Sequence, residues 1–216
     1  MTAIWLFRGI GLWVCGKEEF VLLLYHMSDT LSVGDSLVPD YKKNKSLAEP
    51  FVKALNLGTE AFQNLLLSAE YFGSVLAKYG LSGMPTHETK WAVEGIFEFV
   101  RRREFPDRPG RLGCNYCYDS LALCRRLYEE DWGAAPREER EKIRLFEVEA
   151  PEDFARCDMA LFDRAFDRLL DGQTARDIES CMELARQYYG GGRSETPIPE
   201  ILCVGPATAV RELPLW

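Results

Sequence analysis

The order of apolar and polar residues along this chain predicts a few strands separated by several helices. Residues 20–26 form an apolar run typical of a buried strand, and residues 142–150 alternate as a half-buried strand does. Residues 111–119 predict another strand. Residues 199–213 predict two short strands around a Gly-Pro step, or one strand with a bulge.

Between these strands, apolar residues recur three and four positions apart, which predicts amphipathic helices. The predicted helices cover residues 47–57, 59–80, 86–105, 120–130, 158–170 and 174–189. No glycine-rich phosphate loop joins a strand to a helix, which argues against a doubly wound nucleotide-binding sheet. The pattern therefore favours an α+β fold with a small mixed or antiparallel sheet.

The length and composition predict one domain with an extension at its N-terminus. The chain has 216 residues, of which 47% are hydrophobic, enough for a globular domain without disulfides or a metal. We expect this domain to span residues 20–216, with a helical insertion over residues 47–105 after the first strand. Residues 1–19 are apolar but too short to span a bilayer. They are either an extra strand or the product of a misassigned start codon.

The net charge and the cysteine content indicate which partners and which cellular compartment to expect for this protein. The formal net charge of −8 opposes nucleic-acid binding unless basic residues gather locally. The seven cysteines, an odd number in mostly apolar segments, indicate reduced thiols in a cytoplasmic protein, with export as an effector as the alternative. Cys114 and Cys117 would point to opposite faces of a strand, so we expect no metal site. Because the apolar start of the chain is too short to span a bilayer, we expect no membrane partner.

Polar residues lie at the ends of three predicted strands. His26, one of two histidines, ends the first strand; Tyr116 and Tyr118 lie on the second, just before a helix; Glu200 opens the last. Such a histidine or tyrosine pair is commonly structural, and a glutamate at a strand end commonly faces water. The functional alternative is that these strand ends meet in a cleft.

In this order the three residues resemble the histidine–tyrosine–glutamate type of the ADP-ribosyltransferase fold family. That type has a histidine on its first core strand, a tyrosine on a strand leading into a helix, and a glutamate on a late strand. The segments YHMSDTLSVGD, FEFVRRREFPDRPGR and ARQYYGG followed by PEILCVGP are similar to an uncharacterised bacterial family of this fold. The resemblance implies a split mixed or antiparallel sheet, with the helical insertion after its first strand.

The resemblance also implies NAD as the substrate. Cleavage of the nicotinamide–ribose bond builds positive charge on the ribose, which a nearby carboxylate stabilises. Glu200 would take this role by hydrogen-bonding a ribose hydroxyl. His26 would orient a ribose through its ring nitrogen, and Tyr116 would stack on nicotinamide.

Four further residues are implied in NAD binding. Arg111, which opens the tyrosine-bearing strand, would hold a phosphate bidentately, whereas Arg101, Arg102 and Arg103 are explained as solvated residues at a helix C-terminus. Tyr118 or Tyr128 would help to stack on nicotinamide. The family often has glycine or a hydroxyl residue directly after the histidine. Here Met27 takes that position and Ser28 comes one residue later, so the contact of Ser28 with the nicotinamide amide stays open.

The implied function is ADP-ribosyl transfer to a protein or nucleic-acid acceptor, or NAD hydrolysis, as in a bacterial toxin or effector. Ile198 stands where arginine-modifying members have Glu or Gln, so arginine is not the favoured acceptor. The alternative is a non-catalytic binding protein that keeps the scaffold and uses residues 47–105 as its partner surface. A third alternative, a cysteine hydrolase using His26 or His87, lacks a thiol with a base at fixed spacing.

Overall fold

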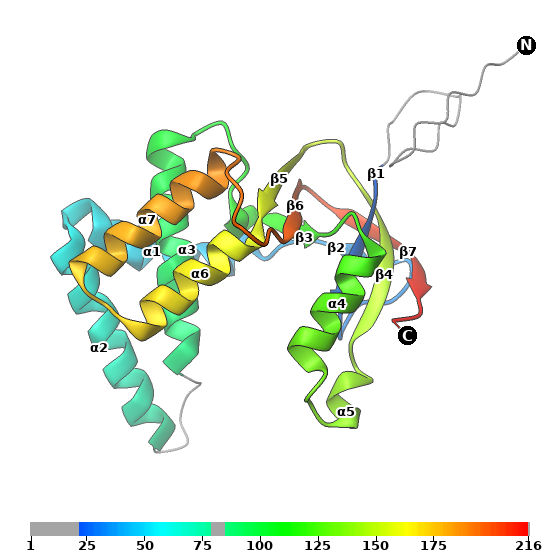
Figure 1. Ribbon diagram of the computed structural model, residues 1–216, viewed down its shortest axis with the longest axis horizontal. Helices are drawn as coiled ribbons and strands as arrows, with labels where there is room; N and C mark the ends of the chain where they lie inside the picture. Colours follow the sequence, from blue (N-terminus) through cyan, green and yellow to red (C-terminus); the bar gives the residue numbers. More distant parts are fainter. Residues whose placement is uncertain (1–21, 79–84, 216) are drawn as a thin grey trace, which may run out of the picture. The chain divides into compact units, whose positions relative to one another are not determined.

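The computed structural model describes residues 22–78 and 85–215 (Figure 1). Within these residues the protein is a mixed α+β structure whose strands pair antiparallel, which confirms the predicted fold class. The chain falls into two compact units, which we call the sheet unit and the helical unit. The sheet unit contains residues 22–39, 114–155 and 200–215, and the helical unit contains residues 40–78, 85–113 and 156–199.

Two sheets lie in the sheet unit, apart from residues 156–158 of β5 and Pro199 of β6. The four-stranded sheet has the order β1-β4-β7-β2, and the three-stranded sheet has the order β3-β6-β5. The strands are β1 (Leu22–Ser28), β2 (Ser36–Leu37), β3 (Cys114–Cys117), β4 (Arg144–Ala150), β5 (Phe154–Asp158), β6 (Pro199–Val204) and β7 (Ala207–Leu213). The two sheets are joined through an isolated bridge in which Tyr25 and Tyr118 exchange two backbone N–H···O bonds of 2.8 Å.

Strand alternation divides the apolar residues of the sheet unit into two clusters. The inner cluster joins the facing surfaces of the two sheets. It consists of Leu24, Leu31, Leu37, Cys117, Phe146, Val148, Ala150, Ile201, Cys203, Ala207 and Ala209. The outer cluster joins β1 and β4 to helix α4 (Leu121–Trp132) and is built on Cys124, Tyr128, Leu145 and Leu215. A short helix, α5 (Arg137–Arg140), follows α4.

Helix α3 is the central element of the helical unit. The unit consists of α1 (Tyr41–Leu57), α2 (Thr59–Lys78), α3 (Pro85–Glu104), the 3-10 turn η1 (Arg111–Gly113), α6 (Met159–Asp171) and α7 (Ala175–Tyr189). Helix α3 packs on α1, α2, α6 and α7, and residues 91–100 are all buried. At Gly95 an added Cβ would lie 2.6 Å from the Cβ of Phe51, so glycine permits α1 to approach this closely. A helix buried on all sides must find partners for its charged residues.

The element boundaries agree with most of the predicted helices and strands and correct two of them. The strand predicted over residues 111–119 begins only at Cys114, because residues 111–113 form a 3-10 turn. The helix predicted over residues 47–57 begins earlier, at Tyr41, because Asp40 caps α1, and the two-residue strand β2 precedes it. The helical unit also includes residues 156–199, so the helices of residues 47–105 share their core with a distant segment.

Candidate functional site

The sheet unit brings the strands of His26, Tyr116 and Glu200 side by side. β3 pairs with β6 so that Tyr116 lies opposite Leu202, and β1 meets β3 at the Tyr25–Tyr118 bridge. Because paired residues share a face and side chains alternate, Glu200 lies on the same face of this sheet as Tyr116.

Glu200 is a buried carboxylate, with only 1% of its surface exposed. Its neighbours Ile201 and Cys203 belong to the inner cluster, so Glu200 points away from that cluster. A carboxylate in such a place interacts with any nearby positive charge far more strongly than one in water does. Chemically, the position suits the stabilisation of a cation.

His26 contacts the backbone of the tyrosine-bearing strand. Its Nδ1 lies 2.8 Å from the carbonyl oxygen of Tyr116. A carbonyl oxygen only accepts, so Nδ1 carries the proton, and in the neutral ring Nε2 keeps its lone pair. Burial lowers the pKa of His26, and the hydrogen bond to Tyr116 only partly opposes this. At neutral pH His26 is therefore an acceptor at Nε2, suited to a ligand hydroxyl.

The lowered pKa predicts how His26 affects stability. As the pH falls below 6.5, the ordinary pKa, the unfolded chain takes up a proton at this residue before the folded protein does. The free energy of unfolding should therefore fall with pH in this range until the folded histidine is also protonated. Urea unfolding of the parent and of His26→Asn between about pH 5 and pH 7.5 should show a shallower slope in the variant. Equal slopes would contradict the account.

Ser28 ends β1 on the same face as His26. Its Oγ accepts the backbone N–H groups of Thr30 and Leu31, each at 3.2 Å, and so shapes the turn after the strand. Because the oxygen already accepts two hydrogen bonds, its own hydrogen is directed to the hydroxyl oxygen of Thr30, 3.3 Å away, a long bond that a stronger acceptor would have to replace.

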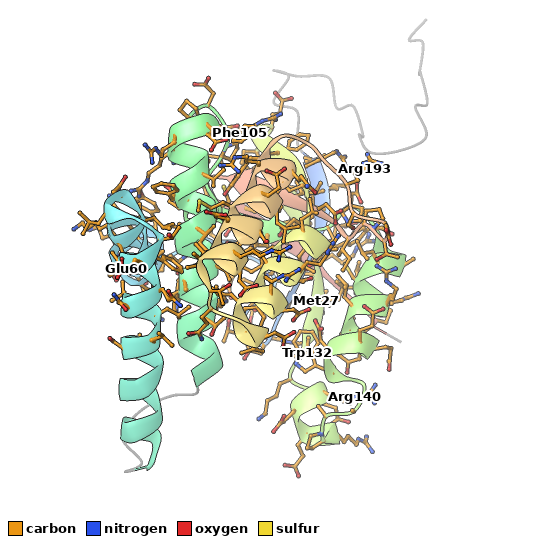
Figure 2. All side chains as sticks on the ribbon, turned by 60° about the vertical axis from the view of Figure 1, so that its left-hand side comes forward. Met27, Glu60, Phe105, Trp132, Arg140 and Arg193 are labelled. Atoms are coloured by element: carbon orange, nitrogen blue, oxygen red, sulfur yellow. The ribbon has the colours of Figure 1, made fainter. Side chains whose placement is uncertain are left out.

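The structure places the two auxiliary tyrosines against the outer cluster. Tyr118 packs there with Tyr25. Tyr128 is buried: its hydroxyl donates to the carbonyl of Arg140 at 3.2 Å, and its ring stacks on Trp132 with centroids 6.1 Å apart. Figure 2 labels Trp132, the last residue of α4, and Arg140, the last residue of α5. Tyr128 therefore fills the core of the sheet unit, and stacking on a ligand would require α4 to move.

Arg111 lies in the helical unit and not on the strand that it was predicted to open. Its Nε is 3.2 Å from Oε2 of Glu94, and its Nη1 donates to the hydroxyl of Tyr188 at 2.8 Å. The guanidinium also lies 3.9 Å from the ring centroid of Phe162. These contacts hold the guanidinium in the core of the helical unit, so a bound phosphate is not needed to explain why an arginine is buried there.

Sequence reasoning missed Arg144, which lies beside the candidate site. In the register of β1 and β4, Arg144 is opposite Ser28, and Phe146 is opposite His26. The signal was present, because Arg144 shares its face of β4 with the apolar residues Phe146 and Val148. A charge on the apolar face of an alternating strand calls for an explanation.

Two further findings concern classes of function. Among the side chains that the structure describes, those of residues 22–69 and 89–215, no three His, Cys, Asp or Glu groups gather in a way that could hold a metal ion. In the same described part of the chain, no helix is both long and apolar enough to cross a membrane. The six cysteines described are free thiols.

The fold and the site together define an α+β protein with a buried carboxylate on β6, next to the strand β3 whose backbone accepts a hydrogen bond from His26. The chain matches the model of a family described as a protein of unknown function (DUF2441) over residues 24–213, and it belongs to that family. A search of curated proteins found no match to the chain.

Proposed function

We propose that this protein cleaves the nicotinamide–ribose bond of NAD and transfers ADP-ribose to a macromolecular acceptor or to water. The observation that carries the proposal is the buried Glu200 carboxylate on β6, beside the strand whose Tyr116 carbonyl accepts the hydrogen bond of His26. The three strands that carry these residues come from separate parts of the chain and are linked through β3, which supports an NAD-cleaving site.

The order of the elements supports an ADP-ribosyltransferase-like fold. The histidine is on the first described strand, the tyrosine strand leads through the Ser120 cap into α4, and the glutamate is on a late strand. Two sheets joined by one described bridge are compatible with a split sheet.

The chemistry follows from the charges of these groups. As the bond from ribose C1′ to nicotinamide breaks, its electron pair moves to the pyridinium nitrogen and C1′ becomes cationic. Glu200 would stabilise this cation by accepting a hydrogen bond from a ribose hydroxyl. The Nε2 atom of His26 would accept a hydrogen bond from a ribose hydroxyl, and the ring of Tyr116 would stack on nicotinamide. The acceptor then forms a bond to C1′ and loses a proton.

Replacing Glu200 with glutamine tests the proposal. Glutamine keeps the size and removes the negative charge, so nicotinamide release from NAD should fall roughly 100-fold. Release is followed by chromatography, together with NAD binding by calorimetry. Glu149→Gln is the matched control, because Glu149 is exposed on β4 of the same unit, and it should leave release unchanged.

The outcomes separate the two candidate functions. NAD binding without release in water would exclude hydrolysis and restrict the proposal to transfer. If the parent neither binds NAD nor releases nicotinamide, the proposal is wrong. A non-catalytic binding protein on this scaffold is then favoured, and the 1% exposure of Glu200 is the observation that supports this second candidate.

A further inference from the structure

Arg144 and Ser28 form a pair across β1 and β4 on the face that carries His26. The register puts Arg144 opposite Ser28 and Phe146 opposite His26. Residues two apart on a strand are about 6.6 Å apart. This separation suits a ribose hydroxyl at His26 and a phosphate of the same nucleotide at Ser28 and Arg144.

The guanidinium of Arg144 is already oriented. Its Nη2 donates to the carbonyl of Leu31, in the turn after β1. Its centre lies 5.3 Å from the ring centroid of Phe146. These two contacts hold the group against the sheet, so a ligand would not have to order a long free side chain.

The carboxylate partner of Arg144 is a loose one. Oε2 of Glu212 lies 3.6 Å from Nη1, and the two side chains are 49% and 35% exposed. In the neighbouring pair of Arg211 and Glu147 the separation is 2.9 Å. Charge-assisted hydrogen bonds are short, so a separation of 3.6 Å leaves Nη1 with most of its donor capacity for a better acceptor.

We infer that Arg144, assisted by the Ser28 hydroxyl, binds the diphosphate of a nucleotide ligand, in the role that the sequence suggested for Arg111. Arg111 is engaged by Glu94 and is only 7% exposed, whereas Arg144 is accessible and lies beside His26. The inference rests on the proposed function in taking a dinucleotide as the ligand. A phosphate at this place would displace the carboxylate of Glu212 from the guanidinium.

Binding of inorganic pyrophosphate and of NAD, measured by calorimetry, tests the inference. Arg144→Gln should weaken pyrophosphate binding about tenfold or more. Glu212→Gln should tighten it about twofold to fivefold, because the competing carboxylate is removed. Arg211→Gln is the matched control on the same sheet and should change nothing. Circular dichroism and urea unfolding of each variant establish that it is folded.

Opposite effects of the Arg144 and Glu212 variants distinguish an anion site from a structural ion pair. If both variants weaken pyrophosphate binding equally, or if neither changes it, the inference is overturned. If Arg144→Gln loses pyrophosphate binding but the parent releases no nicotinamide, the anion site stands and the proposed function fails. If the parent releases nicotinamide and Arg144→Gln binds both probes normally, the function stands and this inference fails.

Discussion

Replacing Glu94 with glutamine is expected to lower the free energy of unfolding by about 3–5 kcal/mol. Glu94 is 3% exposed on the buried stretch of α3, and its carboxylate faces the equally buried guanidinium of Arg111. Without that carboxylate charge, Arg111 keeps a positive charge in a place with little access to water. The hydroxyl of Tyr188 and the ring of Phe162 compensate for only part of the cost.

An exposed pair in the same unit is the matched control. Arg186 and Glu104 are 2.9 Å apart, a closer approach than in the buried pair, but their side chains are 42% and 40% exposed. Glu104→Gln should therefore cost about 1 kcal/mol or less in urea unfolding. A loss in Glu94→Gln no larger than that in Glu104→Gln would contradict the account.

A double variant separates the charge from the packing. Replacing Glu94 with glutamine and Arg111 with methionine together removes both buried charges and keeps a long apolar side chain in place of arginine. The double variant should lose less stability than Glu94→Gln alone. This result would also indicate that Arg111 is needed for the helical unit and not for a ligand.

Most helices could be predicted because periodicity and capping residues agree. Ser120 and Thr174 cap α4 and α7 where expected, and Thr174 forms a capping box with Asp177. The elements that sequence reasoning missed are short: two residues in β2, four in α5 and five in β5. Such segments carry too few residues for a periodic signal, and tertiary contacts decide their conformation.

The site could be predicted in part. The polar strand ends at His26 and Glu200 stand out against apolar neighbours, but the face that each occupies follows from register, which the sequence does not state. The pairing of Ser28 with Arg144 joins residues far apart in the chain. The contacts of Arg111 could not be predicted for the same reason, since its partner Tyr188 is 77 positions away.

Replacing Asp158 with alanine is expected to cost roughly 3–5 kcal/mol of unfolding free energy. Asp158 is buried at the start of α6, and its carboxylate accepts three backbone N–H groups. They belong to Ala160 at 3.1 Å, Ser194 at 2.6 Å and Ile198 at 2.8 Å. Alanine leaves all three donors without this acceptor, and each buried N–H that loses its bond costs about 1–3 kcal/mol.

Graded variants show whether the three bonds are responsible. Asp158→Asn keeps the oxygen that serves Ala160 and Ile198 but turns an amide toward the N–H of Ser194, so its loss should be smaller than that of alanine. Asp177→Ala removes the capping-box carboxylate at the start of α7 and should cost about 1 kcal/mol. Equal losses in the alanine variants at positions 158 and 177 would contradict the account.

The same residue connects stability with the proposed chemistry. Ile198 is two residues before Glu200. Its N–H donates a hydrogen bond to the carboxylate of Asp158, and its carbonyl oxygen accepts one from the N–H of Met159 at 2.8 Å. Loosening these bonds should shift the start of β6, and transition-state stabilisation by a carboxylate is sensitive to displacements of about 1 Å. Asp158→Asn, kept folded at low temperature, should therefore release nicotinamide more slowly than the parent, while Asp177→Ala should not. Equal release rates would indicate that β6 holds Glu200 in place without Asp158.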